Sequence, residues 1–170
     1  MGVRRLALVP TVVLAIAVPG VAGADTDADV RAQVRDLTLS PSMLYPTTLP
    51  SRLRDAEVGL STDRGIAVVW DRGSVSGSDD NRVGFISLTR LPRGQLADDL
   101  RTSRSRGYKP RRVRLRGRRI WRLCGHVCGY AWIEQGRYYG VYGIYYVGDE
   151  DGQTVSRDQR RLIRNLRPLR

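Results

Sequence analysis

Two cysteines are the residues with the clearest capacity for chemistry. Cys124 and Cys128 are the chain's only cysteines, and they enclose Gly125-His126-Val127. If those three residues form a hairpin loop, the cysteines lie directly opposite each other, at a separation that a disulfide bond accepts. We therefore predict a Cys124–Cys128 disulfide formed in an oxidising compartment. Because the loop that it closes is short, the expected stabilisation is only ~2 kcal/mol, and the bond acts as a staple for one hairpin.

Redox and metal chemistry are the alternatives for the same segment. Cys-Gly-His resembles the start of the Cys-Gly-His-Cys site of disulfide isomerases, but Val127 changes the spacing. The residues that follow have a strand pattern, whereas that redox motif opens a helix whose N-terminus activates the thiolate. Cys124, His126 and Cys128 lack the usual metal-ligand spacing and a fourth partner. His126 is the only histidine and lacks the context of a catalytic base, so we expect no catalytic residue, no metal and no cofactor.

Arginines are concentrated in one part of the chain. Residues 101–122 contain ten arginines, one lysine and no acidic residue, against a formal net charge of +12 for all 170 residues. In the predicted strand 111–116, Val113 and Leu115 alternate with arginines, so three guanidinium groups should form an exposed row at steps of ~6.6 to 6.8 Å. Such a row attracts anions. The row is Arg112, Arg114 and Arg116, and the full set of candidate anion-binding residues is Arg111, Arg112, Arg114, Arg116, Arg118 and Arg119.

The partners expected for this charge are anionic cell-wall polymers or lipid headgroups, ahead of nucleic acid. The alternative role is protection, because charge along a sheet edge discourages aggregation between edges. Arginine outnumbers lysine 28 to 1. We attribute that ratio to GC-rich codon usage, so the choice of arginine is not itself evidence for bidentate phosphate recognition.

Tyrosines are concentrated in the strand predicted over 137–147, which carries five of the eight. They could form a stacking platform for sugars or bases beside the arginines. The alternative, which we favour, is a central strand packed on both faces. With Cys124 opposite Cys128, the hairpin register places Arg122 opposite Tyr130, where it could stack at the surface. The same register pairs Trp121 with Ala131 and Ile120 with Trp132, and the candidate surface aromatics are Tyr130, Trp132, Tyr138 and Tyr142.

The spacing of apolar residues and turn residues predicts the elements that must position these groups. We expect an α+β fold: a curved antiparallel sheet with an inserted helix and a C-terminal helix packed on one face. Ser156 and Gln159 are spaced as a capping box for the last helix, which presents Leu162, Ile163 and Leu166 to the core. The predicted helices cover 25–39, 95–106 and the residues after 156; the predicted strands cover 57–61, 65–71, 82–90, 111–116, 118–124, 128–134 and 137–147; a proline-rich extended arm precedes them, and residues 73–81 and 149–152 form a loop and a turn.

The first 24 residues have the pattern of a secretory signal peptide. Arg4 and Arg5 precede an apolar run from Leu6 to Val18, and Ala22-Gly23-Ala24 supplies the small residues of a cleavage site. The run is shorter than the ~18 to 20 residues that a membrane span needs, so we expect cleavage near Ala24 and no transmembrane segment in the mature chain. The predicted organisation is a signal peptide over 1–24, a helix and arm over 25–54, and one α+β domain over 55–170.

One hairpin resembles a known group of proteins. Residues 130–143 run Tyr-Ala-Trp-Ile-Glu-Gln-Gly-Arg-Tyr-Tyr-Gly-Val-Tyr-Gly, and an amphipathic helix follows. This W-x-E-x-G-x-x-Y-x-V-x-G pattern resembles the end of small actinobacterial extracytoplasmic domains of unknown function. Some of those domains resemble the lipoprotein-carrier fold and the ectodomains of sigma-factor regulators. The resemblance implies a curved antiparallel sheet and a binding or sensing role without catalysis.

These observations favour a secreted, non-enzymatic module that engages anionic envelope material through its arginine-rich strand. Two alternatives stay open. One is an enzyme, either a thiol oxidoreductase or a hydrolase whose site the sequence does not reveal. The other is a structural exported protein with no specific ligand.

Overall fold

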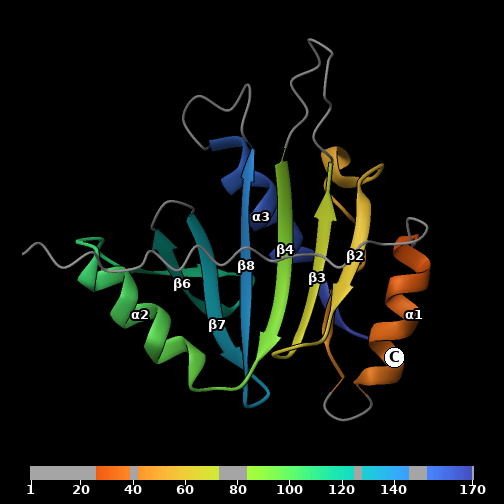
Figure 1. Cartoon of the computed structure of the whole chain (residues 1–170). Helices are drawn as coiled ribbons and strands as arrows, with labels where there is room; N and C mark the ends of the chain where they lie inside the picture. The colour runs from red at the N-terminus through yellow and green to blue at the C-terminus, as the bar shows by residue number, and fades with distance from the viewer. Residues whose placement is uncertain (1–25, 39–41, 73–83, 125–127, 146–152, 170) are drawn as a thin grey trace, which may run out of the picture.

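The computed structural model describes residues 26–38, 42–72, 84–124, 128–145 and 153–169, with Tyr145 described by its backbone alone. Within these residues, three α-helices, one short 3-10 helix and nine strands follow one another along the chain (Figure 1). Their bounds are α1 Asp27–Leu37, β1 Leu44–Pro46, η1 Ser51–Leu53, β2 Glu57–Ser61, β3 Ile66–Asp71, β4 Gly84–Leu91, α2 Gln95–Ser105, β5 Arg111–Leu115, β6 Arg118–Cys124, β7 Cys128–Glu134, β8 Arg137–Tyr145, α3 Gln153–Asn165 and β9 Leu166–Pro168.

The main sheet has seven antiparallel strands in the order β2-β3-β4-β8-β7-β6-β5, and β1 pairs with β9 in a second, two-stranded sheet. Two of its hairpins turn through two residues with positive φ. These are Arg116 (50°) with Gly117 (79°), and Gln135 (53°) with Gly136 (71°). Such turns match the right-handed twist of the flanking strands. The predicted α+β class and antiparallel sheet are confirmed.

The larger core lies between one face of the sheet and the elements α1, β1 and α3. We call this side the α3 face. Trp70, Trp132 and Tyr139 are buried on it. Leu162 and Ile163 of α3 are fully buried against it, as is Leu166 at the start of β9, and this confirms the predicted core positions of all three.

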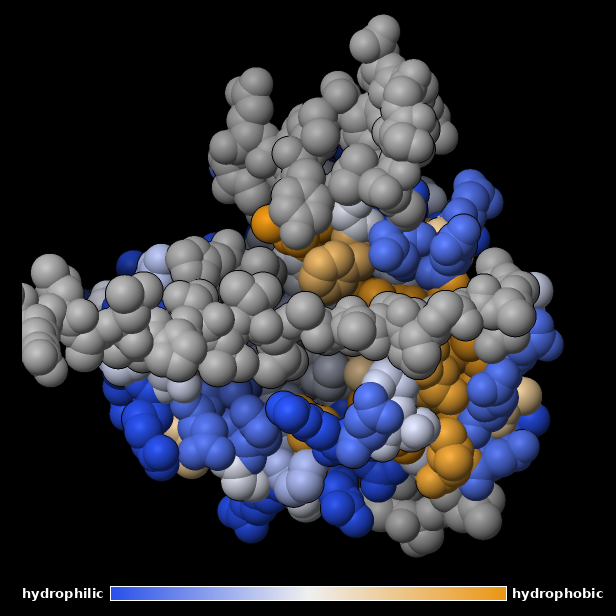
Figure 2. Space-filling model, viewed as in Figure 1, coloured by the Kyte–Doolittle hydropathy of each residue, from blue (hydrophilic) through white to orange (hydrophobic). Residues whose placement is uncertain are grey.

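Helix α2 covers the opposite side of the sheet, the α2 face. Leu96 and Leu100 pack there against a small cluster that includes Leu123 and Tyr138. In Figure 1, α2 lies in front of the strands and α3 behind them. The two helices therefore lie on opposite faces rather than on one face, because successive side chains of each strand point to opposite sides and each helix takes one set. Figure 2 shows the α2 face, with hydrophilic side chains over α2 and hydrophobic ones toward β2 and β3.

The N-terminal helix and arm belong to the same core as the sheet. Thr26 caps α1, and Val30 and Val34 are fully buried, whereas Leu37 at the end of the helix is 55% exposed. In the arm, Leu44 and Tyr45 are buried within β1. The segment 25–54 is therefore packed into the domain over its described part.

The predicted capping box at Ser156 and Gln159 is wrong. Helix α3 begins three residues earlier, at Gln153, so both side chains lie inside the helix. Each is buried and takes a partner from the sheet instead of from its own helix end: Ser156 contacts the hydroxyl of Tyr130, and Gln159 donates to the carbonyl of Cys128. A spacing that is common at helix ends here serves tertiary contacts.

Several sequence predictions concern residues outside those described: the signal peptide over 1–24, the polar loop 73–81, His126 and the turn 149–152. None of the helices within the described ranges has the length and apolar character needed to cross a membrane.

Candidate anion-binding clefts and the disulfide

A disulfide joins Cys124 at the end of β6 to Cys128 at the start of β7, as predicted. The predicted register is also confirmed where the ladder pairs these strands: Cys124 lies opposite Cys128, Arg122 opposite Tyr130 and Trp121 opposite Ala131. The bond therefore pins the end of a hairpin whose next residues inward are Arg122 and Tyr130 on the same face.

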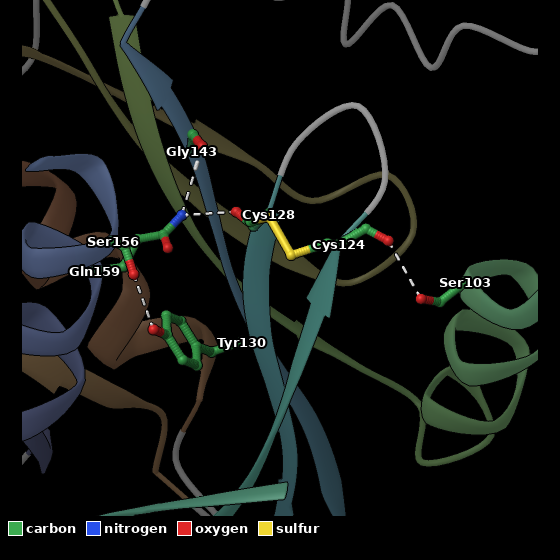
Figure 3. Close-up of a disulfide and its surroundings, with 7 residues drawn as sticks. All are labelled: Ser103, Cys124, Cys128, Tyr130, Gly143, Ser156 and Gln159. Atoms are coloured by element: carbon green, nitrogen blue, oxygen red, sulfur yellow. Dashed lines mark hydrogen bonds between the residues drawn. A yellow bond between two sulfur atoms is a disulfide. The ribbon is translucent and has the colours of Figure 1, made fainter. Parts of the chain in front are cut away.

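Helices on both sides of the sheet hold the backbone carbonyls of the two cysteines (Figure 3). Ser103 of α2 donates a 3.2 Å hydrogen bond to the carbonyl of Cys124. Gln159 of α3 donates a 3.0 Å hydrogen bond to the carbonyl of Cys128, and its amide nitrogen lies 3.5 Å from the carbonyl oxygen of Gly143. The disulfide end of the hairpin is thus a point to which α2, α3 and β8 are all attached.

Arg112, Arg114 and Arg116 are all exposed, as predicted, but they do not form one continuous row. Arg112 lies opposite Trp121, and Arg114 lies opposite Arg119, so both arginines point to the α2 face. Arg116 follows the end of β5 and occupies the turn with a φ of 50°. Its guanidinium donates a 2.7 Å hydrogen bond to the carbonyl of Arg164. With this positive φ, Arg116 is part of the turn and not of the strand, so the alternation of side chains that the prediction assumed ends at Leu115.

Arg118 is a structural residue rather than an exposed anion ligand. Its guanidinium makes two hydrogen bonds to the carboxylate of Glu134, at 2.6 and 3.2 Å, and its side chain is only 17% exposed. The same carboxylate accepts a 2.9 Å hydrogen bond from the indole of Trp132. Further contacts of 3.5 Å reach the carbonyls of Ile163 and Leu166, so this ion pair ties β6 and β7 to the end of α3.

Four arginines from two parts of the chain line a cleft of about 460 Å³ on the α3 face. Arg122 reaches it from β6, and Arg157 and Arg160 reach it from α3, whereas Arg114 borders it from the edge strand β5 with its side chain directed to the α2 face. No acidic residue is found among the described residues that line it. We call it the α3 cleft; its lining is Val113, Arg114, Leu115, Arg122, Tyr130, Gln153, Ser156, Arg157 and Arg160.

Polar groups at the base of the α3 cleft are held in place by one another. The hydroxyl oxygens of Tyr130 and Ser156 lie 3.0 Å apart, and Arg160 donates a 3.2 Å hydrogen bond to the carbonyl of Ser156. Arg157 and Arg160 are three residues apart on α3, a spacing that places side chains on the same side of a helix. The arrangement gathers fixed hydroxyls and several guanidinium groups, which is the donor set that recognises phosphate or carboxylate groups.

A second cleft of about 470 Å³, the edge cleft, adjoins the same strand. Arg112 stacks on Trp121 there, with its guanidinium carbon 4.6 Å from the ring centroid. Arg119 completes a set of three arginines with Arg112 and Arg114. The lining of the edge cleft is Arg112, Val113, Arg114, Arg119, Ile120 and Trp121.

Three of the four candidate surface aromatics are core residues. Tyr130, Trp132 and Tyr138 are 3%, 1% and 1% exposed, and Tyr142 is half-buried. The physical reason is that β7 and β8 are central strands whose two faces are covered by α3 and α2. The alternative reading of the tyrosine-rich strand, packing on both faces, is the one that the burial supports. Tyr130 therefore offers no exposed ring for Arg122.

Three arginines of the α3 cleft are absent from the set of anion-binding residues predicted from the sequence: Arg122, Arg157 and Arg160. The spacing of Arg157 and Arg160 along the final helix, next to its apolar side, could have indicated that both lie near the sheet. For Arg118, extension of the predicted hairpin register places it opposite Glu134, which indicates an ion pair rather than an exposed cation. Comparison of the chain with protein-family models, curated proteins and solved structures finds no match.

Proposed function

We propose that the protein is an exported, non-enzymatic binding module that captures phosphate-bearing anions of the cell envelope in the α3 cleft. The observation that carries this proposal is the convergence of Arg122, Arg157 and Arg160 on one cleft, with Arg114 at its border. Such a concentration of like charges raises the local potential and attracts counter-charges. Bringing guanidinium groups together also has an electrostatic cost, which a bound anion relieves.

The size and donor set of the cleft fit a phosphate-containing group. A volume of about 460 Å³ falls within the range of small-molecule sites and exceeds what one inorganic phosphate fills. Arginine forks make paired hydrogen bonds to phosphate oxygens. The paired hydroxyls of Tyr130 and Ser156 leave one O–H group to donate in the same cleft. A phosphate joined to a sugar or glycerol unit would use both the arginines and the remaining space.

Within the described lining of the α3 cleft, Ser156 is the only residue with a serine hydroxyl that could act as a nucleophile, and its contacts favour binding over hydrolysis. Ser156 has its hydroxyl paired with that of Tyr130, at 3.0 Å. An activated serine needs a general base within hydrogen-bond distance. Neither histidine nor a carboxylate is present among the described residues that line the cleft. A hydrolase site would have to use groups other than these.

An extracytoplasmic location is part of the proposal. The Cys124–Cys128 disulfide supports it, because such bonds persist mainly in oxidising compartments. The apolar N-terminal segment with its small-residue cleavage pattern supports it independently. Wall polymers with phosphate groups and anionic lipid headgroups are then the accessible partners.

The test is a thermal-shift titration of the purified protein with inorganic phosphate, tripolyphosphate and glycerol phosphate, with chloride as the reference salt. A ligand at one hundred times its Kd stabilises the folded state by about 2.7 kcal/mol. The double variant Arg122→Gln, Arg157→Gln should lose the shift. Both residues are exposed, so the fold should tolerate the change.

A matched control removes the same charge elsewhere. Arg54 and Arg93 are exposed and lie outside both clefts, so Arg54→Gln, Arg93→Gln should keep the full shift. Equal loss in both double variants would mean that net charge alone binds anions. That result, or no shift for the unmodified protein, would overturn the proposed function.

A further inference from the structure

We propose that the ligand is a linear polymer of phosphate groups that passes around the edge strand β5, from the α3 cleft into the edge cleft. This inference rests on the proposed function, because it names the ligand class of the same site. It adds a second binding surface, on the other face of the sheet, and a role for Arg112 and Arg119.

The two clefts are joined at one strand. Val113 and Arg114 line both of them. Strand β5 is the last in the order of the main sheet, so within the described chain no strand lies beyond it. A flexible polymer can therefore turn around this edge and contact Arg114 on the way, without crossing another element.

Like charges face each other across the β5–β6 ladder on both sides of the sheet. Arg111 lies opposite Arg122, and Arg114 lies opposite Arg119. Directly opposed side chains have Cβ atoms about 4.5 to 5.5 Å apart, and like charges at such positions destabilise a sheet. Among the described residues no carboxylate forms an ion pair with any of these four arginines. A row of anionic groups along both faces would neutralise both pairs.

The geometry favours a chain over a compact anion or a flat surface. A single phosphate group cannot contact two faces of one sheet at once. A membrane surface is flat on this scale and would meet one face. The stacking of Arg112 on Trp121 orders its side chain before binding, which reduces the entropy that an anion would otherwise have to remove. A linear polymer is the ligand that uses all of these arginines together.

The experiment compares a short and a long ligand of the same chemistry. Tripolyphosphate and long-chain polyphosphate are titrated against the unmodified protein, Arg122→Gln with Arg157→Gln, and Arg112→Gln with Arg119→Gln. The first double variant should weaken both ligands. The second should leave tripolyphosphate binding unchanged and weaken the long chain at least tenfold. It should also reduce the slope of log K against log salt by about 1.4, at ~0.7 per lost contact.

A spectroscopic readout checks the position of the chain without any variant. Trp121 is half-buried, whereas Trp70 and Trp132 are 0% and 1% exposed, so quenching by neutral acrylamide reports mainly on Trp121. Long-chain polyphosphate should protect the fluorescence from acrylamide, and tripolyphosphate should not. The variant Trp121→Phe should abolish the protection.

The outcomes separate the two proposals. Loss of tripolyphosphate binding in the α3-cleft variant, with long-chain binding unaffected by the edge-cleft variant, would retain the proposed function and overturn this inference. Failure of the unmodified protein to bind either ligand would overturn both. Titrations with teichoic acid and single-stranded DNA identify the natural source of the polymer. If the protein binds single-stranded DNA or anionic lipid vesicles but not long-chain polyphosphate, the inference is also overturned. Either result would mean that recognition needs bases or a membrane surface in addition to the phosphate groups.

Discussion

The hydroxyl of Tyr138 donates a 2.5 Å hydrogen bond to Oδ2 of Asp99 and so links the central strand β8 to helix α2. The same oxygen accepts a 3.0 Å hydrogen bond from Tyr142, and the two phenol oxygens lie 2.8 Å apart. Gln95 donates to the other carboxylate oxygen at 2.7 Å. One carboxylate with three donors thus fixes the position of α2, whose remaining contacts with the sheet are largely apolar.

This network predicts a loss of stability in alkaline solution. Burial raises the pKa of Tyr138, and Tyr142 and Asp99 raise it further; burial and Asp99 also raise the pKa of Tyr142. Phenols of the unfolded chain ionise near pH 10, while these stay protonated in the folded protein. Stability is therefore intact below about pH 10 and falls above it, by about 1.4 kcal/mol per pH unit for each such phenol. Denaturant unfolding at a series of alkaline pH values measures this slope.

The variant Tyr142→Phe isolates one phenol. Above about pH 10, it should reduce the loss of unfolding free energy by about 1.4 kcal/mol per pH unit, the share of one phenol. At neutral pH it should cost about 1.5 to 3 kcal/mol, because a hydrogen bond to a carboxylate is lost. Tyr108 is 40% exposed, so Tyr108→Phe should change neither quantity. An alkaline slope that Tyr142→Phe leaves unchanged would contradict the prediction.

Tyr142 also makes substitution of Gly129 costly. A Cβ atom at Gly129 would overlap the ring of Tyr142 and lie 2.7 Å from the carbonyl oxygen of Val141. The ring cannot move aside freely, because its hydroxyl is bound to Asp99. Gly129→Ala should therefore destabilise the protein by about 1 to 3 kcal/mol, the usual cost of overpacking. Denaturant unfolding at neutral pH measures it.

Gly59 provides the matched strand control. It lies in β2, and an added Cβ would meet nothing within 4 Å. Gly59→Ala should be neutral or stabilise the fold by up to about 1 kcal/mol, because the unfolded chain loses freedom. Equal destabilisation by the two substitutions would show that the close contact at Gly129 is not the cause.

The strands of the main sheet were predictable because their signals are local. The bounds of β2, β6 and β7 are those expected from alternation and from the cysteine and glycine positions. Strands β1 and β9 were not predicted. Each has three residues, which is too few for a period to show, and each ends in a proline. Their pairing joins Leu44 to Pro168 and depends on contacts across most of the chain.

The α3 cleft was only partly predictable. Local charge density identified Arg114, but Arg157 and Arg160 stand some 40 residues further along the chain. Their role depends on which side of α3 meets β5 and β6, and side-chain periodicity alone does not specify the facing strands. The ion pair of Arg118, another candidate anion-binding residue, with Glu134 was not predicted, because local charge density does not show which residue lies opposite on the next strand.

The disulfide predicts a moderate response to reduction. Breaking Cys124–Cys128 should cost about 2 kcal/mol, as expected for a closed loop of roughly five residues. The hairpin end should stay attached to α2 and α3, because Ser103 and Gln159 bind backbone carbonyls rather than sulfur atoms. Denaturant unfolding with and without a reductant gives the difference. Alkylation of both cysteines in the unreduced protein, detected by mass spectrometry, would show that the bond is absent.

The buried contacts of Gln159 predict that the variant Gln159→Glu loses stability in a pH-dependent way. Its side-chain amide donates to the carbonyl of Cys128, the residue is 0% exposed, and among the described residues its Oε1 has no hydrogen-bond partner. Gln159→Glu would put a carboxylate against the same carbonyl oxygen. Burial and repulsion would raise the pKa of that carboxyl above the ~4.3 of an unfolded glutamate. The variant should keep most of its stability below about pH 4 and lose it as the pH rises toward neutrality.

The comparison variant is Gln159→Leu, which removes the amide donor and the unpaired oxygen together. It should cost about 1 to 3 kcal/mol, because the carbonyl of Cys128 loses its buried partner, and this cost should not change between acid and neutral pH. Denaturant unfolding of both variants at about pH 4 and about pH 7 separates the two effects. If Gln159→Glu loses no more stability than Gln159→Leu on passing from acid to neutral pH, then the hydrogen bond from Gln159 to the Cys128 carbonyl is not shielded from water. The attachment of α3 to the disulfide hairpin must then depend on the contact between Ser156 and Tyr130.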